Sequence, residues 1–195
     1  MRPERRAAIV LLTVVVVVCA ACGSSNDTAG STHAPPKACP KTWSASWQTW
    51  ANRVGMTIYC PGWLPSPIDG VIHGQWNTAR VPDKQWQLGY AWLEQGELVH
   101  VVFEGYPPGT FPPRCEGRPC FAGREPATEK VGGQTVTWYD HNLASHTGHI
   151  AAIFHAGGNV YVISIHVASP VSTPAKAKSD LRHIIRSLVP MHPES

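Results

Sequence analysis

The stretch GHIAAIFHAGGNVYVISIHVA, residues 148–168, decides the fold of this 195-residue chain. Apolar side chains recur at every second position on both sides of Gly157-Gly158, which is the pattern of two strands joined by a two-residue turn. The alternation predicts an antiparallel hairpin with a core face and an opposite face. The core pairs are Phe154–Tyr161, Ala152–Ile163 and Ile150–Ile165, and the opposite pairs are His155–Val160, Ile153–Val162, Ala151–Ser164 and His149–His166.

Two more hairpins are predicted in the same way. In WQLGYAWLEQGELVHVVFEG, residues 86–105, a turn at Gln95-Gly96 places six apolar side chains on one face. The facing pairs are Trp92–Val99, Tyr90–Val101 and Leu88–Phe103, whereas the other face has Gln87, Ala91, His100 and Glu104. This hairpin is therefore predicted to be buried on one side only. In ATEKVGGQTVTWYD, residues 127–140, the turn falls at Gly132-Gly133.

Helices are predicted before and after the strands. In TWSASWQTWANRVG, residues 42–55, one helical stripe contains Trp43, Trp47, Trp50 and Val54. Gly55 suits the position after the end of this helix. Near the C-terminus, Thr173 is expected to cap a helix that begins at Pro174. Its buried stripe is Leu181, Ile184, Ile185 and Leu188.

The order of these elements defines the expected fold class. It predicts a single α+β domain, residues 39–190, followed by a tail at 191–195. We expect a curved antiparallel sheet of six or seven strands, with the N-terminal and the C-terminal helix packed on one face. The segments YCPGWLP, KVGGQTVTWY and GGNVYVISIHV…LRHIIRSLV resemble a diffuse class of small extracytoplasmic bacterial domains, found on lipoproteins and beside anti-sigma factors. That class is related in shape to PsbP/Mog1 and LolA-like sheets, and the resemblance implies a fold and a compartment without catalytic residues.

The first residues form a three-part leader. Arg2, Arg5 and Arg6 make a basic start, and an apolar run of fifteen residues follows, interrupted by Thr13. At ~1.5 Å per residue a helix of this length reaches about 22 Å, short of the ~30 Å hydrocarbon core of a bilayer. We therefore interpret residues 1–21 as a signal peptide that is cut away, and not as a lasting membrane span.

The end of the leader, Cys19-Ala20-Ala21-Cys22, resembles the lipobox of bacterial lipoproteins. In that pattern two small residues precede a cysteine that receives a diacylglycerol thioether. The resemblance implies that Cys22 is the lipidated first residue of the mature chain, with palmitate-type chains that hold the protein at the extracytoplasmic face of the cell membrane. Cys19 departs from the pattern, because an aliphatic residue is usual there. The alternative is an ordinary secretory signal that leaves Cys22 free or in a disulfide.

Residues 22–38 are expected to act as a flexible linker behind the lipidated cysteine. The stretch GSSNDTAGSTHAPPK, residues 23–37, is small and polar, and as flexible coil it would reach roughly 20–25 Å. Loss of residues 1–21 removes three arginines and Glu4, which leaves 13 basic and 12 acidic residues. This balance predicts neither a nucleic acid partner nor a polybasic membrane patch. We expect the protein to contact the membrane through its lipid anchor.

Four cysteines remain in the domain, and an exported location makes disulfides the favoured reading. Proximity in sequence favours the pairs Cys39–Cys60 and Cys115–Cys120. A zinc site is the competing reading, but the spacings contain no CxxC pair. The second pair would close the centre of YPPGTFPPRCEGRPCFAGREP, residues 106–126, whose six prolines and three glycines predict a long loop.

Histidine is the compositional peculiarity, with ten residues in the chain. The predicted register places His149 opposite His166, and His141 and His146 lie in the loop just before. Neutral imidazoles at cross-strand distance can bind Zn²⁺ or Cu²⁺, so these four are candidate metal ligands. The competing reading is a polar sheet face with histidine as an ordinary strand residue. No other cofactor is expected.

A binding or accessory role is the favoured function. Trp63, Trp76, Trp86 and Trp138, with Phe111, are candidates to line a cleft between sheet and helices. Its ligand would be a lipid, a cell-wall fragment or another envelope protein; alternatively, these tryptophans fill the core. A metal-handling lipoprotein built on the histidines is the second hypothesis.

An envelope hydrolase is the third and least supported hypothesis. Asp140, Ser145 and His146 invite a triad reading, but they are neighbours on one loop, whereas working triads converge from separated elements. The sequence contains no G-x-S-x-G and no phosphate-binding glycine loop. Enzymatic activity is therefore not expected.

Overall fold

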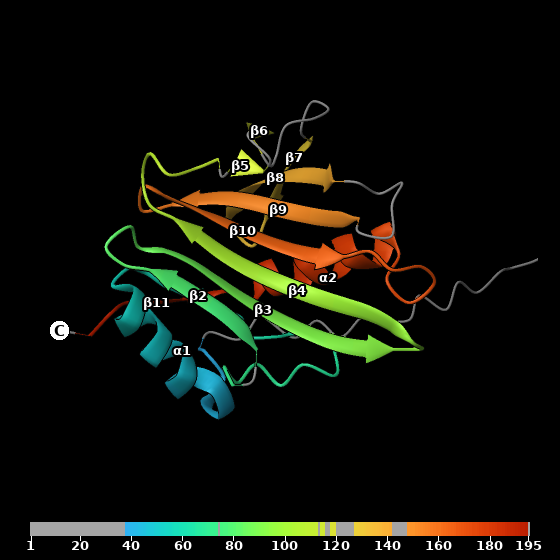
Figure 1. Cartoon of the computed structure of the whole chain (residues 1–195), viewed down its shortest axis with the longest axis horizontal. Coiled ribbons are helices and arrows are strands. Elements are labelled where there is room, and N and C mark those ends of the chain that lie inside the picture. The colour runs from blue at the N-terminus through green and yellow to red at the C-terminus, as the bar shows by residue number, and fades with distance from the viewer. Residues whose placement is uncertain are drawn as a thin grey trace, which may run out of the picture. The chain divides into compact units, whose positions relative to one another are not determined.

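The computed structural model describes residues 38–73, 75–112, 114–115, 118–119, 127–141 and 148–194, all within one unit that spans 33–195. The lipidation candidate Cys22, the leader and most of the linker lie outside these residues. The elements in chain order are α1 (Lys41–Val54), β1 (Ile58–Cys60), β2 (Trp76–Arg80), β3 (Gln85–Glu94), β4 (Glu97–Tyr106), β5 (Arg114–Cys115), β6 (Arg118–Pro119), β7 (Ala127–Val131), β8 (Gln134–His141), β9 (His149–Ala156), β10 (Asn159–His166), α2 (Pro174–Arg186) and β11 (Val189–Met191) (Figure 1). This content confirms the α+β class.

One antiparallel sheet of seven strands dominates the described residues, in the order β2-β3-β4-β10-β9-β8-β7 (Figure 1). The three predicted hairpins are β3–β4, β7–β8 and β9–β10, each with its two strands adjacent. β4 pairs with β10 and so joins the first hairpin to the third across a long stretch of chain. β2, which the sequence pattern did not predict, adds the strand at one edge.

The predicted registers are confirmed at all three turns. Phe154 faces Tyr161 and Val101 faces Tyr90, as the alternation requires. The turn residues Gly157 and Gly158 have φ of 56° and 80°. Positive φ at both central positions is typical of the type I′ turn, whose twist matches that of the flanking strands. Local turn chemistry and alternation therefore suffice to fix each hairpin.

Both predicted helices are present, and their ends follow the expected chemistry. Gly55 caps the end of α1: it has φ of 68° and donates its backbone N–H to the carbonyl of Ala51 at 2.9 Å. The Thr173 side chain accepts a hydrogen bond of 3.2 Å from the N–H of Lys176, which satisfies one free donor at the start of α2. Leu188, predicted in the stripe of this helix, lies beyond its end and is half-buried.

One large core cluster unites apolar residues from both helices and from one set of alternating strand positions. It includes Trp47, Trp50 and Val54 of α1, Leu181, Ile184 and Ile185 of α2, and Leu88, Phe103, Ile150, Phe154, Ile163 and Ile165 of the sheet. The Trp47 ring packs edge-on against Phe103, with centroids 5.5 Å apart. Trp47 and Trp50 therefore fill the core, whereas Trp43, predicted in the same stripe, is half-buried and packs against it.

The opposite side of the sheet, here called the outer face, is less exposed than predicted. A second cluster of buried residues forms there around Tyr106, Ala151, Ile153, Val160 and Val162, and Phe111 and Tyr139 pack against it. The sequence predicts burial on one side for the β3–β4 hairpin, and β9 and β10 do not follow that pattern. Ile153 and Val162 are apolar on the face opposite the core, so both sides of these central strands are buried.

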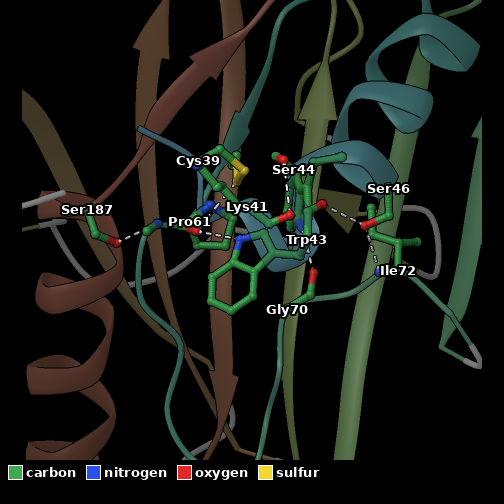
Figure 2. Close-up of a disulfide and its surroundings, with 12 residues drawn as sticks. Cys39, Lys41, Trp43, Ser44, Ser46, Pro61, Gly70, Ile72 and Ser187 are labelled. Carbon is green, nitrogen blue, oxygen red and sulfur yellow. Dashed lines mark hydrogen bonds between the residues drawn. A yellow bond between two sulfur atoms is a disulfide. The ribbon is translucent and has the colours of Figure 1, made fainter. Parts of the chain in front are cut away.

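A disulfide joins Cys39 to Cys60 and ties the chain before α1 to β1. Figure 2 shows Trp43 beside this bond, with its indole N–H donating to the carbonyl of Pro61 at 3.0 Å. On the other side of the loop, the Ser187 hydroxyl accepts hydrogen bonds from the N–H groups of Gly62 and Trp63. The loop after β1 is thereby held between the first turn of α1 and the end of α2. Cys120, of the second predicted pair, lies outside the described residues.

The C-terminal residues extend the packing beyond residue 190. Met191 belongs to β11 and pairs with Ile58 of β1. The carbonyl of His192 accepts a hydrogen bond of 2.7 Å from Gln48, and the N–H of Glu194 donates to Asn52 at 2.9 Å. The segment predicted as a tail is therefore in contact with α1 through residue 194.

Candidate binding hollow and histidine cluster

A hollow of about 600 Å³ lies on the outer face, where β2 and β4 end and β3 begins. We call it the polar hollow. Its lining consists of Thr78, Arg80, Gln85, Trp86, Gln87, Glu104, Tyr106, Gly109, Thr110 and Pro112. Most of these side chains are polar, which distinguishes the hollow from the tryptophan-lined cleft that the sequence predicts.

Cross-strand register explains why polar side chains gather here. Gln87 on β3 lies between Thr78 on β2 and Glu104 on β4. Two residues further along β2, Arg80 pairs with Gln85. Because every second strand residue faces the same way, these positions share the outer face.

Glu104 is the chemically distinctive residue of the hollow. Its Oε1 accepts a hydrogen bond of 2.8 Å from the Gln87 amide, and its Oε2 accepts one of 2.9 Å from the Tyr106 hydroxyl. Burial raises the pKa of the Glu104 carboxyl above its usual range, although the two hydrogen bonds act in the opposite direction. A shielded carboxyl with two fixed donors is held in one orientation toward the hollow.

Tyr106 and Arg80 complete the polar set. Burial, and then the neighbouring Glu104, raises the pKa of the Tyr106 hydroxyl well above its usual range, so this group stays protonated and acts as a donor. The charge of Arg80 acts in the opposite direction on Tyr106, which places the guanidinium near this pair. Arg80 is exposed and forms no ion pair with any described residue. Its donors are therefore accessible from the hollow.

The segment 107–112 forms one wall. The Thr110 hydroxyl and backbone N–H both donate to the carbonyl of Pro107, at 2.7 and 3.1 Å, which closes a tight turn. Phe111, a predicted cleft residue, packs edge-on against Tyr106 with centroids 5.4 Å apart. It covers the second core cluster and is absent from the lining of the hollow.

The four candidate tryptophans do not line one cavity in the described part of the chain. Trp86 borders the polar hollow, and Trp138 is buried in the main core near the Arg182 guanidinium. Trp63 stacks on His183 of α2 at 4.0 Å, and Trp76 lies on the outer face, 42% exposed, over Gly89. The structure thus brings only one of the four to the hollow.

Three histidines meet on the outer face. Nε2 of His100 lies 3.2 Å from Nε2 of His149, and the His166 ring stacks on His100 with centroids 4.7 Å apart. The sequence predicts the His149–His166 pair, which the register confirms, but not the contribution of His100. His100 belongs to another hairpin, and only the pairing of β4 with β10 brings it to this place.

The remaining candidate residues are less informative. The backbone of His141 pairs with that of His149, whereas His146 and Ser145 lie outside the described residues. Asp140 lies 3.4 Å from the Lys178 ammonium of α2 as an ion pair. No three His, Cys, Asp or Glu side chains within the described ranges are already arranged to hold a metal ion.

Comparisons with protein family models, with curated proteins and with solved structures find no match for this chain. Among the described residues, no helix has both the length and the apolar character that a membrane crossing requires.

Proposed function

We propose that this chain is a lipid-anchored cell-envelope protein of binding type, and that the polar hollow receives a hydroxyl-rich fragment of the cell wall. The observation behind the ligand class is the Glu104 carboxyl, held by Gln87 and Tyr106 at the wall of the hollow. A carboxylate accepts hydrogen bonds from sugar hydroxyls, while Arg80 donates to ligand oxygens. A glycan matches this lining better than a lipid, because buried polar groups facing an acyl chain would lose hydrogen bonds without replacement.

The proposal for the architecture is that both helices cover the core face and leave the ligand to the outer face. The core cluster supports this, since it combines side chains of both helices with one set of strand positions. The lining of the hollow comes mainly from the other set. A ligand would then bind without disturbing the main core.

The proposed anchor is a diacylglyceryl group on Cys22, which leads through residues 23–37 to the domain. The support is the leader pattern with Cys19-Ala20-Ala21-Cys22, and the Cys39–Cys60 disulfide fits an oxidising compartment outside the cytoplasm. A two-chain anchor binds membranes far more stably than a single acyl chain. The domain would face the cell wall at the extracytoplasmic side of the membrane.

Calorimetric titration of the full chain in detergent micelles with a soluble muropeptide tests the ligand proposal. We expect saturable binding that weakens about tenfold or more in Glu104→Gln, because hydrogen bonds to a charged group contribute ~1.5–3 kcal/mol. Glu97→Gln is the matched control, since Glu97 is an exposed carboxylate on the same strand outside the hollow. Absence of saturable binding, or equal weakening in both variants, would overturn the proposal.

The anchor is tested separately by intact-mass analysis of protein purified from cells, together with fractionation of Cys22→Ser. We expect a mature chain that begins at Cys22 and has the mass of a diacylglyceryl group, with release of the variant from the membrane fraction. A mature chain that begins elsewhere, or a variant retained as firmly as the wild type, would refute the lipid anchor.

A further inference from the structure

The strand order of the sheet brings histidines from distant segments into one row. β4, β10 and β9 lie side by side (Figure 1) and place His100, His166 and His149 next to one another on the outer face. His100 of this row precedes Glu104 by four residues on β4. At ~3.3 Å per strand residue, the two positions are roughly 13 Å apart. The row is therefore a separate feature from the polar hollow.

The spacing of two of these rings suits a metal ion. Zn²⁺ or Cu²⁺ binds imidazole nitrogen at ~2.0–2.1 Å, so two ligands at tetrahedral or right angles lie about 2.9–3.4 Å apart. The Nε2 atoms of His100 and His149 are 3.2 Å apart. Without a metal, the same spacing accommodates one shared proton in an N–H···N hydrogen bond. The separation of these two nitrogens is thus within the range of two ligands on one ion.

The surroundings hold these rings in place. Nδ1 of His166 lies 2.8 Å from the carbonyl oxygen of Leu98, which can only accept, so this nitrogen donates. This hydrogen bond fixes the orientation of the His166 ring. His166 then stacks on His100 at an interplanar angle of 15°. Trp76 also packs edge-on against His100, with centroids 5.7 Å apart.

The three rings are also suitably placed for a ligand role. Imidazole binds a metal ion through a lone pair of its neutral form. His100, His149 and His166 are all half-buried on the outer face.

We propose that His100 and His149 bind one borderline divalent metal ion, Cu²⁺ or Zn²⁺, through their Nε2 atoms on the outer face. Water completes the coordination sphere, and His166 is a positioning residue that holds the His100 ring. Cu²⁺ is expected to bind more tightly than Zn²⁺, in keeping with the general affinity order of nitrogen sites. The proposal does not depend on the polar hollow, because no residue of the pair lines it.

The test is titration of the metal-stripped full chain with Cu²⁺, and separately with Zn²⁺, at pH 7 in detergent micelles. We expect one saturable site whose affinity falls at least tenfold in His100→Gln and in His149→Gln. His155→Gln is the matched control, because His155 is an exposed histidine on the same strand and face as His149. We expect it to bind both metals as the wild type does.

Two further measurements separate loss of ligands from loss of fold. Saturating metal should raise the melting temperature of the wild type and of His155→Gln but not of His149→Gln, because a ligand that binds only the folded state stabilises it. The Cu²⁺ electron paramagnetic resonance spectrum should show coupling to at least two imidazole nitrogens. Absence of saturable binding, coupling to fewer than two nitrogens, or equal losses in His155→Gln and His149→Gln would overturn the site.

Discussion

Removal of the Cys39–Cys60 disulfide should lower the free energy of unfolding by an amount that follows from the loop it closes. The bond links residues 21 apart in sequence. The chain-entropy relation gives about 3.3 kcal/mol at 25 °C for a closed loop of that length. In a domain of this size each kcal/mol shifts the melting temperature by roughly 2–4 °C, so we expect Cys39→Ala/Cys60→Ala to melt about 7–13 °C lower. Alanine avoids leaving a hydroxyl at the fully buried position 60.

The assay is urea unfolding followed by circular dichroism, with the two single variants as controls. Either single change removes the whole bond, so each should lose about as much stability as the double variant, a strongly non-additive cycle. Two side chains that merely pack together would give smaller losses that add. A double variant less than about 1 kcal/mol weaker than the wild type, or additive single losses, would refute the reasoning.

Three other changes probe a close contact in the sheet, a residue of the hollow and the cap of α2. Gly105→Ala would put a Cβ against the indole ring of the buried Trp86. We therefore expect a loss of roughly 1–3 kcal/mol in urea unfolding, and a loss below about 0.5 kcal/mol would contradict this packing. Because burial raises the pKa of Glu104, the folded state holds its proton more tightly than the unfolded state does. The free energy of unfolding of the wild type should therefore fall as pH rises through that raised pKa, and it should depend less on pH in Glu104→Gln. Identical pH profiles of the two proteins would contradict a raised pKa of Glu104. Thr173→Ala removes the cap of α2 and should cost ~1 kcal/mol by the same unfolding assay, whereas an unchanged midpoint would show that the cap contributes nothing.

The hairpins were predictable because their determinants are local. Gly157-Gly158 fixes a turn with positive φ, and the alternation on either side then sets every cross-strand pair. The caps of α2 are equally local, since Thr173 and Pro174 are adjacent in sequence. Interactions within about twenty residues of chain therefore defined most of the secondary structure.

The order of the hairpins in the sheet was not predictable from such local patterns. The pairing of β4 with β10 joins segments some sixty residues apart, and this pairing creates the contact of His100 with His149 and His166. Of the three, the sequence pattern placed only His149 and His166 together, because they share a hairpin. Which hairpin lies beside which depends on how the apolar faces of all the strands and helices pack together. No single stretch of sequence specifies that packing.

Local sequence patterns do not predict the polar hollow either. It needs Thr78 and Arg80 of β2, and residues 76–80 lack the apolar alternation that marks a strand. The predicted register of β3 and β4 places Gln87 and Glu104 on one polar face, but it does not indicate that a hollow lies there. A high tryptophan content is compatible with a ligand cleft and with a core, and in this fold Trp138, Trp47 and Trp50 are part of the core.

The most direct test of the central claim, that the hollow beside Glu104 is the binding site, is an amide ¹H–¹⁵N spectrum. The full chain in detergent micelles would be titrated with a soluble muropeptide. The proposed function predicts saturable shifts that cluster in residues 78–87 and 104–112. Shifts that cluster on α1 or α2, or a spectrum that does not change, would contradict it.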